Sequence, residues 1–149
     1  MPNEFSALIA KLDAVKGDAL KQAERKALTE VGQIVKTAIV ERTRVQSGVP
    51  EGILKPGELA ASIKATVHIA SDEATTKGDV SRVTIGPNSQ ATRSVANWIE
   101  NGHVNARATT GEKNTPPYPF IRPAQDATQQ QAVDAYAATM TAEVTKALK

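Results

Sequence analysis

Two long stretches of helical periodicity, one towards each end, restrict the fold of this chain more than any other feature of its sequence. In the first, apolar residues recur every three or four positions, at Phe5, Leu8, Ile9, Leu12 and Val15. The same spacing resumes further on, at Leu20, Ala23, Ala27, Leu28, Val31, Ile34, Val35, Ala38 and Ile39. A single apolar face of this length predicts an amphipathic helical region that packs against another element.

Gly17 and Asp18 divide this N-terminal stripe. Glycine is less favourable than alanine inside a helix by about 1 kcal/mol. Asp18 is able to cap a following helix by accepting a backbone N–H. The sequence therefore allows two interpretations, a break at this point or one continuous helix that tolerates the glycine.

A second long helix is predicted from about Pro123 to the C-terminus. Its apolar stripe consists of Ile121, Ala124, Ala127, Val133, Tyr136, Met140, Val144 and Leu148. Pro123 suits a first helical turn, because its missing N–H would have no partner there and its φ is already helical. Aromatic residues make up only 3% of the chain, so the core under these helices is built from Leu, Ile, Val and Ala and is thin.

The middle of the chain contains two strand patterns. Apolar and polar residues alternate from Ile63 to Ile69 and again in "SRVTIG", which ends at Gly86. The polar stretch between them ends in a Gly-Asp turn signal, so an antiparallel hairpin is expected. "RSVANWIENG" predicts a short helix with Gly102 at a left-handed C-terminal cap. Loops are expected at 43–57, 71–79 and 103–117.

Together these elements predict one α+β domain spanning residues 1–149. The long N-terminal and C-terminal helices would pack on one face of a small antiparallel β-sheet. The chain contains no cysteine, which excludes a disulfide framework and a thiol nucleophile. No apolar run approaches the roughly 20 residues of a membrane span, and no signal-peptide pattern is present, so no membrane partner is expected.

The residue types that carry chemistry form no convincing site. His68 and His103 are the only histidines, and neither has a metal-ligand spacing. No phosphate-binding loop is present, and Asp72 and Glu73 lie in a turn where solvated charge is the default. We therefore expect no enzyme, cofactor or metal. A net charge of +2 is too small to indicate nucleic-acid binding by itself.

The stretch "TPPYPFIRPA" at 115–124 contains four prolines and a concentration of the scarce aromatic residues. The prolines bias their neighbours towards extended backbone, so Tyr118 and Phe120 are expected on a stiff segment that leads into the last helix. With Trp98, these aromatics either fill the end of the core or form an interface, and both roles are compatible. We also expect Arg122 to pair with a carboxylate, either Glu100 or an acidic residue of a neighbouring copy. The interface candidates are Trp98, Glu100, Tyr118, Phe120 and Arg122.

Three motifs in order resemble the tail-completion or head–tail joining proteins of long-tailed bacteriophages. They are "KPGELAASI", "VANWIENG" and "PPYPFIRPAQDA". Their matching residues are Pro56, Gly57, Leu59, Ser62 and Ile63; Ala96, Glu100 and Gly102; and Pro119, Phe120, Arg122, Pro123 and Ala124. The last motif is the most specific of the three.

The resemblance implies a structural virion protein at the head–tail junction, present in the host cytoplasm during assembly. It implies a ring, often of six copies, around the DNA channel. Its neighbours would be the connector or stopper, the tail terminator and the tail tube, with nonspecific contact to exiting DNA. One alternative is a small nucleic-acid-binding regulator, which steeply salt-dependent DNA binding would favour. Another is a hydrolase-like enzyme, which is disfavoured because the sequence shows no convincing nucleophile–base pair.

Overall fold

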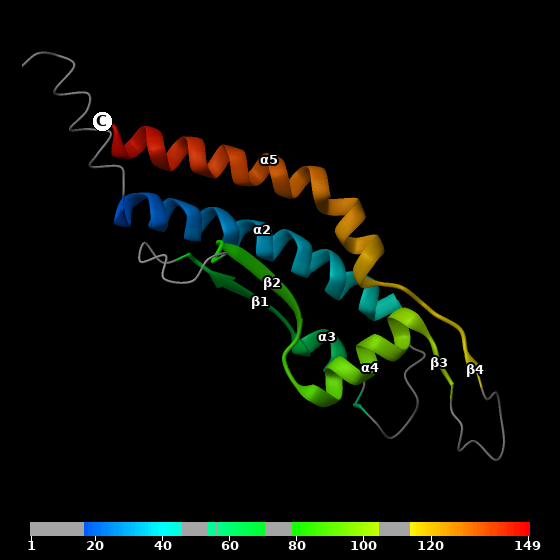
Figure 1. Ribbon diagram of the computed structural model, residues 1–149. Helices are drawn as coiled ribbons and strands as arrows, with labels where there is room; N and C mark the ends of the chain where they lie inside the picture. Colours follow the sequence, from blue (N-terminus) through cyan, green and yellow to red (C-terminus); the bar gives the residue numbers. More distant parts are fainter. Residues whose placement is uncertain (1–16, 46–53, 56, 71–78, 105–113) are drawn as a thin grey trace, which may run out of the picture. The chain divides into compact units, whose positions relative to one another are not determined.

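The computed structural model describes residues 17–45, 54–55, 57–70, 79–104 and 114–149 (Figure 1). Its elements are α2 (Asp18–Val45), α3 (Glu58–Ser62), β1 (Ile63–His68), β2 (Arg82–Pro87), α4 (Gln90–Asn101), β3 (His103–Val104), β4 (Asn114–Thr115) and α5 (Ile121–Ala147). The α+β class is confirmed, with two long helices and a small antiparallel sheet of β1 and β2. The stripe predicted at 5–15 and most of the predicted loops lie outside the described residues.

The chain divides into two compact units. Unit 1 comprises Met1–Gly32, Thr66–Thr84 and Gln130–Lys149, and unit 2 comprises Gln33–Ala65 and Ile85–Gln129. Both long helices and both strands of the β1–β2 sheet run from one unit into the other. Each unit is described by itself below, and the single domain expected over 1–149 stays a prediction.

Helix α2 begins directly after Gly17. This glycine has a φ of 83°, and its carbonyl accepts the N–H of Lys21 at 3.0 Å. Gly17 therefore takes the N-cap position, with a positive φ that glycine adopts without steric cost. The helix does begin at the possible break, but its N-cap residue is Gly17 and not Asp18 as expected. Asp18 lies in the first turn, where its negative charge stabilises the helix by interacting with the positive end of the helix dipole.

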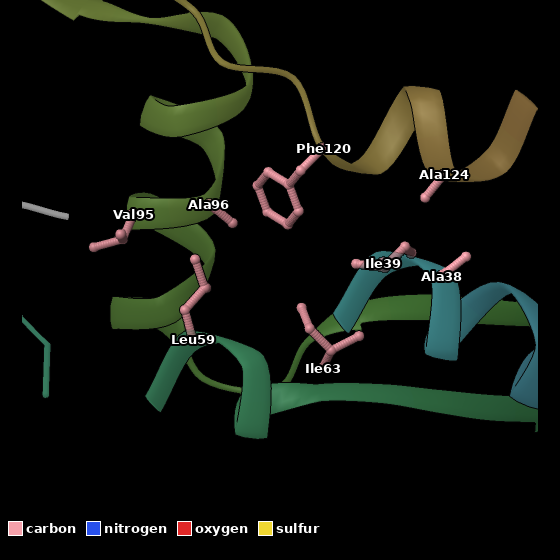
Figure 2. Packing of buried hydrophobic residues seen from close by; sticks show 8 residues of the cluster. All are labelled: Ala38, Ile39, Leu59, Ile63, Val95, Ala96, Phe120 and Ala124. Atoms are coloured by element: carbon pink, nitrogen blue, oxygen red, sulfur yellow. The ribbon is translucent and has the colours of Figure 1, made fainter. Parts of the chain in front are cut away.

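Unit 2 contains an apolar core in which large side chains pack against alanines. The cluster consists of Ala38, Ile39, Leu59, Ile63, Val95, Ala96, Phe120 and Ala124. Figure 2 shows the Phe120 ring projecting from the start of α5 towards Ala96 on α4 and Ile39 on α2. Phe120 and Ile39 are only 1% and 2% exposed. Burying each such side chain contributes about 1.5–3 kcal/mol, so this cluster is the main source of stability in unit 2.

Unit 1 holds α2 and α5 together through small residues and polar contacts. Lys26 pairs with Glu143, and the Thr139 hydroxyl donates to the Glu30 carboxylate. Going from Lys26 to Glu30 along α2, the contact partner on α5 moves back from Glu143 to Thr139. These parts of the two helices therefore run antiparallel. Among the described residues of unit 1, the buried apolar side chains are the alanines at 23, 27 and 132. Their small side chains let the helix backbones approach closely.

The stripe predicted for α5 is wrong at Ala127 and Val133. Both residues are exposed, Val133 to 58%, whereas Ala124, Thr128 and Ala132 are buried. Nine residues separate Ala124 from Val133, which at 100° per residue places them on opposite faces of the helix. Thr128 takes a position on the buried face despite its polarity, because its hydroxyl donates to the Ala124 carbonyl at 2.8 Å.

Helix α4 starts three residues earlier than predicted because a capping box precedes it. The Ser89 hydroxyl accepts the Thr92 N–H at 3.2 Å, and the Thr92 hydroxyl accepts the Ser89 N–H at 3.3 Å. Two further elements were not predicted. Helix α3 follows Gly57, and the loop expected at 103–117 contains the antiparallel pair β3–β4, in which His103 lies opposite Thr115.

Candidate interface at the start of α5

The buried carboxylate of Glu100 holds the first turn of α5. Its Oε2 accepts the backbone N–H groups of Phe120 at 2.8 Å and Ile121 at 2.9 Å. Its Oε1 accepts the N–H of Arg122 at 3.1 Å. Glu100 is only 8% exposed, so these bonds form in a largely water-free place, where a bond to a charged acceptor is strong.

This arrangement satisfies every backbone donor at the start of α5. The three N–H groups that lack a partner within the helix all go to Glu100. Pro123 follows and has no N–H to satisfy. The next donor, Ala124, already bonds to the Phe120 carbonyl at 3.4 Å. A residue twenty positions away thus supplies the cap that the local sequence lacks, and the negative charge also suits the positive end of the helix.

The side chain of Arg122 also contacts Glu100 and its neighbour Asn101, on the solvent side of the capped helix start. Its Nη2 donates to the Asn101 side-chain oxygen at 3.0 Å, and its Nε lies 3.7 Å from Glu100 Oε1. The expected pairing with Glu100 within the subunit is therefore present. Its side chain is nevertheless 73% exposed, so the guanidinium is held in one place and still reaches the surface.

Backbone contacts fix the segment that precedes Phe120. The N–H of Tyr118 donates to the Ile99 carbonyl at the end of α4, at 2.7 Å. Gly102, with φ 72° and ψ 168°, lets the chain turn sharply after α4. A Cβ at Gly102 would lie 2.6 Å from the Thr115 carbonyl oxygen, so the backbone at Thr115 passes in direct contact with it. Gly102 is required, though in a different conformation from the left-handed cap predicted.

Aromatic and apolar side chains remain accessible around this fixed segment. Trp98 is 36% exposed and stacks on His103, with ring centroids 5.3 Å apart. Tyr118 is 56% exposed, and Val104 on β3 is 71% exposed. We call Trp98, Val104, Tyr118 and Arg122 the α4–α5 surface. All of them belong to unit 2.

The five residues singled out from the sequence separate into two groups. Glu100 and Phe120 are buried and hold the start of α5 from within. Trp98, Tyr118 and Arg122 are accessible. Sequence reasoning missed Val104, and it missed the capping role of Glu100. The absence of Ser, Thr, Asp or Asn directly before α5 was a usable signal, because a helix start without a local cap needs an acceptor from elsewhere.

The described part of the chain gives no other site of this kind. Within it, no three His, Asp or Glu side chains gather as they would to hold a metal ion. No described helix combines the length and apolar character needed to cross a membrane. What the described geometry offers is a group of exposed side chains next to a backbone segment that hydrogen bonds to Glu100 and Ile99 hold in place.

The comparison with protein families identifies the class. Residues 6–102 match the family described as "Bacteriophage HK97-gp10, putative tail-component". The match covers well over half of the chain, and the chain therefore belongs to this family of phage tail components. Comparison with curated proteins and with solved structures gave no match. The match ends at Gly102, so the "PPYPFIRPA" segment and α5 lie beyond it.

Proposed function

We propose that this protein is a structural component of the phage head–tail junction, where several copies form a ring around the DNA channel and join head to tail. Family membership supports a tail-related structural role. The observation that carries the proposal is the α4–α5 surface, in which Trp98 on α4 is exposed together with Tyr118 and Arg122 at the start of α5, which Glu100 fixes from within. Trp, Tyr and Arg are the residue types that dominate binding energy at protein interfaces.

A ring requires two different patches on each copy, because each subunit contacts its neighbours through a heterologous interface. The α4–α5 surface supplies one of these patches. Its backbone is already held by the Glu100 and Ile99 hydrogen bonds, so docking costs little conformational entropy. We propose that the ring, often of six copies in such assemblies, forms on an adjacent ring of the neck or tail, and that the isolated protein is monomeric or weakly associated.

The proposed contact with DNA is nonspecific. The chain carries a net charge of only +2, and its arginines are scattered. A channel lined by several such subunits would attract the phosphate backbone weakly and without sequence preference. Binding of the isolated protein to DNA should therefore be lost at moderate salt. A footprint at a defined sequence would favour the alternative of a nucleic-acid-binding regulator.

The test is incorporation of variants into phage particles. Trp98→Ala and Tyr118→Ala should each reduce incorporation at least about tenfold, because truncated hot-spot residues cost roughly 2 kcal/mol or more. Arg122→Ala should also reduce incorporation, and its melting temperature should stay nearly unchanged, because the Arg122 side chain is 73% exposed and Glu100 keeps its three backbone N–H donors.

Val133→Ala is the matched control, since Val133 is about as exposed as Tyr118, at 58% against 56%, but belongs to unit 1. It should enter particles normally. The proposal fails if the variants at 98 and 118 are folded and enter particles as well as the control does. Electron microscopy that places the protein away from the head–tail junction would also overturn it.

A further inference from the structure

The guanidinium of Arg122 is held by an asparagine of α4 and still has N–H groups to offer. Its Nη2 donates to the Asn101 side-chain oxygen at 3.0 Å. Its Nε lies 3.7 Å from the Glu100 carboxylate, beyond hydrogen-bond distance. A guanidinium carries five N–H groups in a planar fork and has no acceptor. Among the described residues, Asn101 is therefore its hydrogen-bond acceptor, and most of the fork is left for a group outside the subunit.

A second asparagine fixes the amide of Asn101. The Asn101 Nδ2 donates to the Asn97 side-chain oxygen at 2.8 Å and to the Asn97 backbone carbonyl at 3.3 Å. The backbone carbonyl can only accept and Arg122 can only donate, so one orientation of the Asn101 amide satisfies both neighbours. The contacts from Asn97 through Asn101 thus set the direction of the guanidinium, and all three side chains are exposed.

Local stability does not explain why an arginine stands at this position. A positive charge in the first turn of α5 is disfavoured by the helix dipole. The Glu100 oxygens already accept three backbone N–H groups, so Arg122 is not needed to satisfy them. A guanidinium held in one direction is suited to a carboxylate, because two of its parallel N–H groups match the two carboxylate oxygens.

We propose that Arg122, with Asn101 as its positioning residue, binds the carboxylate of an Asp or Glu side chain on a neighbouring protein subunit. This inference rests on the proposed function, since it names the chemical group that the α4–α5 surface recognises. Because Asn101 already restrains the long arginine side chain, forming the pair costs less conformational entropy than it would with a free arginine.

The surroundings of Arg122 favour a protein partner over DNA. Trp98 lies three residues before Asn101 and therefore close to it on the surface of α4, and it is 36% exposed. Exposed aromatic residues beside an arginine are typical of protein interfaces. DNA binding needs several cations. The charged residue that contacts Arg122 and the one that follows it within a turn of α5 are both acidic, namely Glu100 and Asp126.

Incorporation of variants into phage particles tests the role of the fork. Arg122→Lys keeps the charge but loses the planar fork, so it should lower incorporation about three- to tenfold. Asn101→Ala should lower it by a similar factor because it releases the guanidinium, and its melting temperature should stay nearly unchanged. Asn97→Ala is the matched control, since the Asn97 backbone carbonyl still holds the Asn101 amide. It should change incorporation less than about twofold.

Carbodiimide treatment of the Arg122→Lys variant identifies the partner group. The reagent condenses an amine with a carboxylate in contact with it, so the introduced amine should become linked to an Asp or Glu of another subunit. Mass spectrometry of the linked peptides then gives the position of that residue. The isolated variant is the control, because a link to Glu100 of the same subunit would form there as well. The expected result is a link that forms in particles alone.

Three outcomes would overturn the inference. The first is normal incorporation of Arg122→Lys, which would mean that charge alone is needed, as for a DNA phosphate. The second is an Asn97→Ala effect as large as that of Asn101→Ala. The third is the absence of any link specific to particles. Trp98→Ala separates this inference from the proposed function. If it lowers incorporation while the variants at 122 and 101 do not, the interface stands and the carboxylate partner is wrong. If it enters normally, the proposed function fails.

Discussion

The two compact units bury apolar surface in different ways. Unit 2 encloses Phe120, Ile39, Ile63 and Val95 almost completely, whereas the described part of unit 1 buries alanines and leaves its larger apolar residues half-buried or exposed. Buried area determines hydrophobic stabilisation, so unit 2 should hold most of the free energy of folding. Unit 1 should open more readily, because local stability follows the density of buried apolar contacts. The candidate interface is thus built on the more rigid unit.

Phe120→Ala should produce the largest loss of stability in the chain. Removing a fully buried aromatic ring leaves a cavity and costs about 3–5 kcal/mol. Tyr136→Ala removes a half-buried ring from the same helix in unit 1, and it should cost less than half as much. Urea denaturation followed by circular dichroism measures both. Equal losses would mean that unit 1 has a core comparable to that of unit 2.

Gly102→Ala should have the next largest effect, about 3 kcal/mol, since an alanine would be strained at this backbone conformation and its Cβ would strike the Thr115 carbonyl. Gly57 is the matched control, because it has a similar φ of 80° but open space around it. Gly57→Ala should cost only about 1 kcal/mol. Thermal denaturation compares the two. Similar losses at both positions would show that φ alone matters and that the contact with Thr115 does not constrain unit 2.

Glu100→Gln should destabilise the protein by about 2 kcal/mol, because one amide oxygen replaces two charged acceptors for three N–H groups, of which that of Phe120 is buried and those of Ile121 and Arg122 are partly buried. Glu58→Gln is the control, since the Glu58 carboxylate accepts a single N–H, from Lys55, at an exposed site. Its effect should stay within a few tenths of a kcal/mol. Exchange rates of amides 120–122 should rise in the Glu100 variant alone. If they do not, another group caps α5.

Glu143 should give the smallest effect, and one that depends on pH. The hydrogen bond from Lys26 holds the pKa of Glu143 below its ordinary value, helped by the charges of Lys26 and Lys146. A carboxyl whose pKa is lowered on folding stabilises the protein above its unfolded pKa, and this contribution disappears as the pH falls through the folded pKa. Glu143→Gln should therefore lower the melting temperature slightly at neutral pH and match the wild type in acid. A difference that persists in acid would rule out this ion pair as its source.

Much of the fold could be predicted from periodicity. The spacing of apolar residues indicated α2 and α5, and the alternation from Ile63 indicated β1. The register of α5 was harder, because the helix is rich in alanine and its buried face includes Thr128 in place of a larger apolar residue. The start of α4 was readable from the Ser89 and Thr92 pair, which is the sequence form of a capping box.

The candidate site could be predicted only in part. Proline geometry and the concentration of aromatics indicated that the stretch around Tyr118 and Phe120 is special. The sequence left open which of the two points inward, since that depends on where α4 lies. The strands β3 and β4, with two residues each, carry no periodic signal. The cap from Glu100 is a tertiary contact between residues twenty apart, and local propensity contains no information about it.

The position of Glu100 also has a consequence for the order of folding. The first turn of α5 has no capping side chain next to it in the sequence, so its N–H groups gain their protein acceptor only after the chain has looped back from α4. Closing that loop costs conformational entropy before the hydrogen bonds to Glu100 can form and offset it. Most helices of this length nucleate wherever a turn first forms, but α5 should grow from its middle and gain its first turn last. The residues of the α4–α5 surface would then reach their final geometry only when the rest of unit 2 is in place, so an incompletely folded subunit would lack the proposed interface.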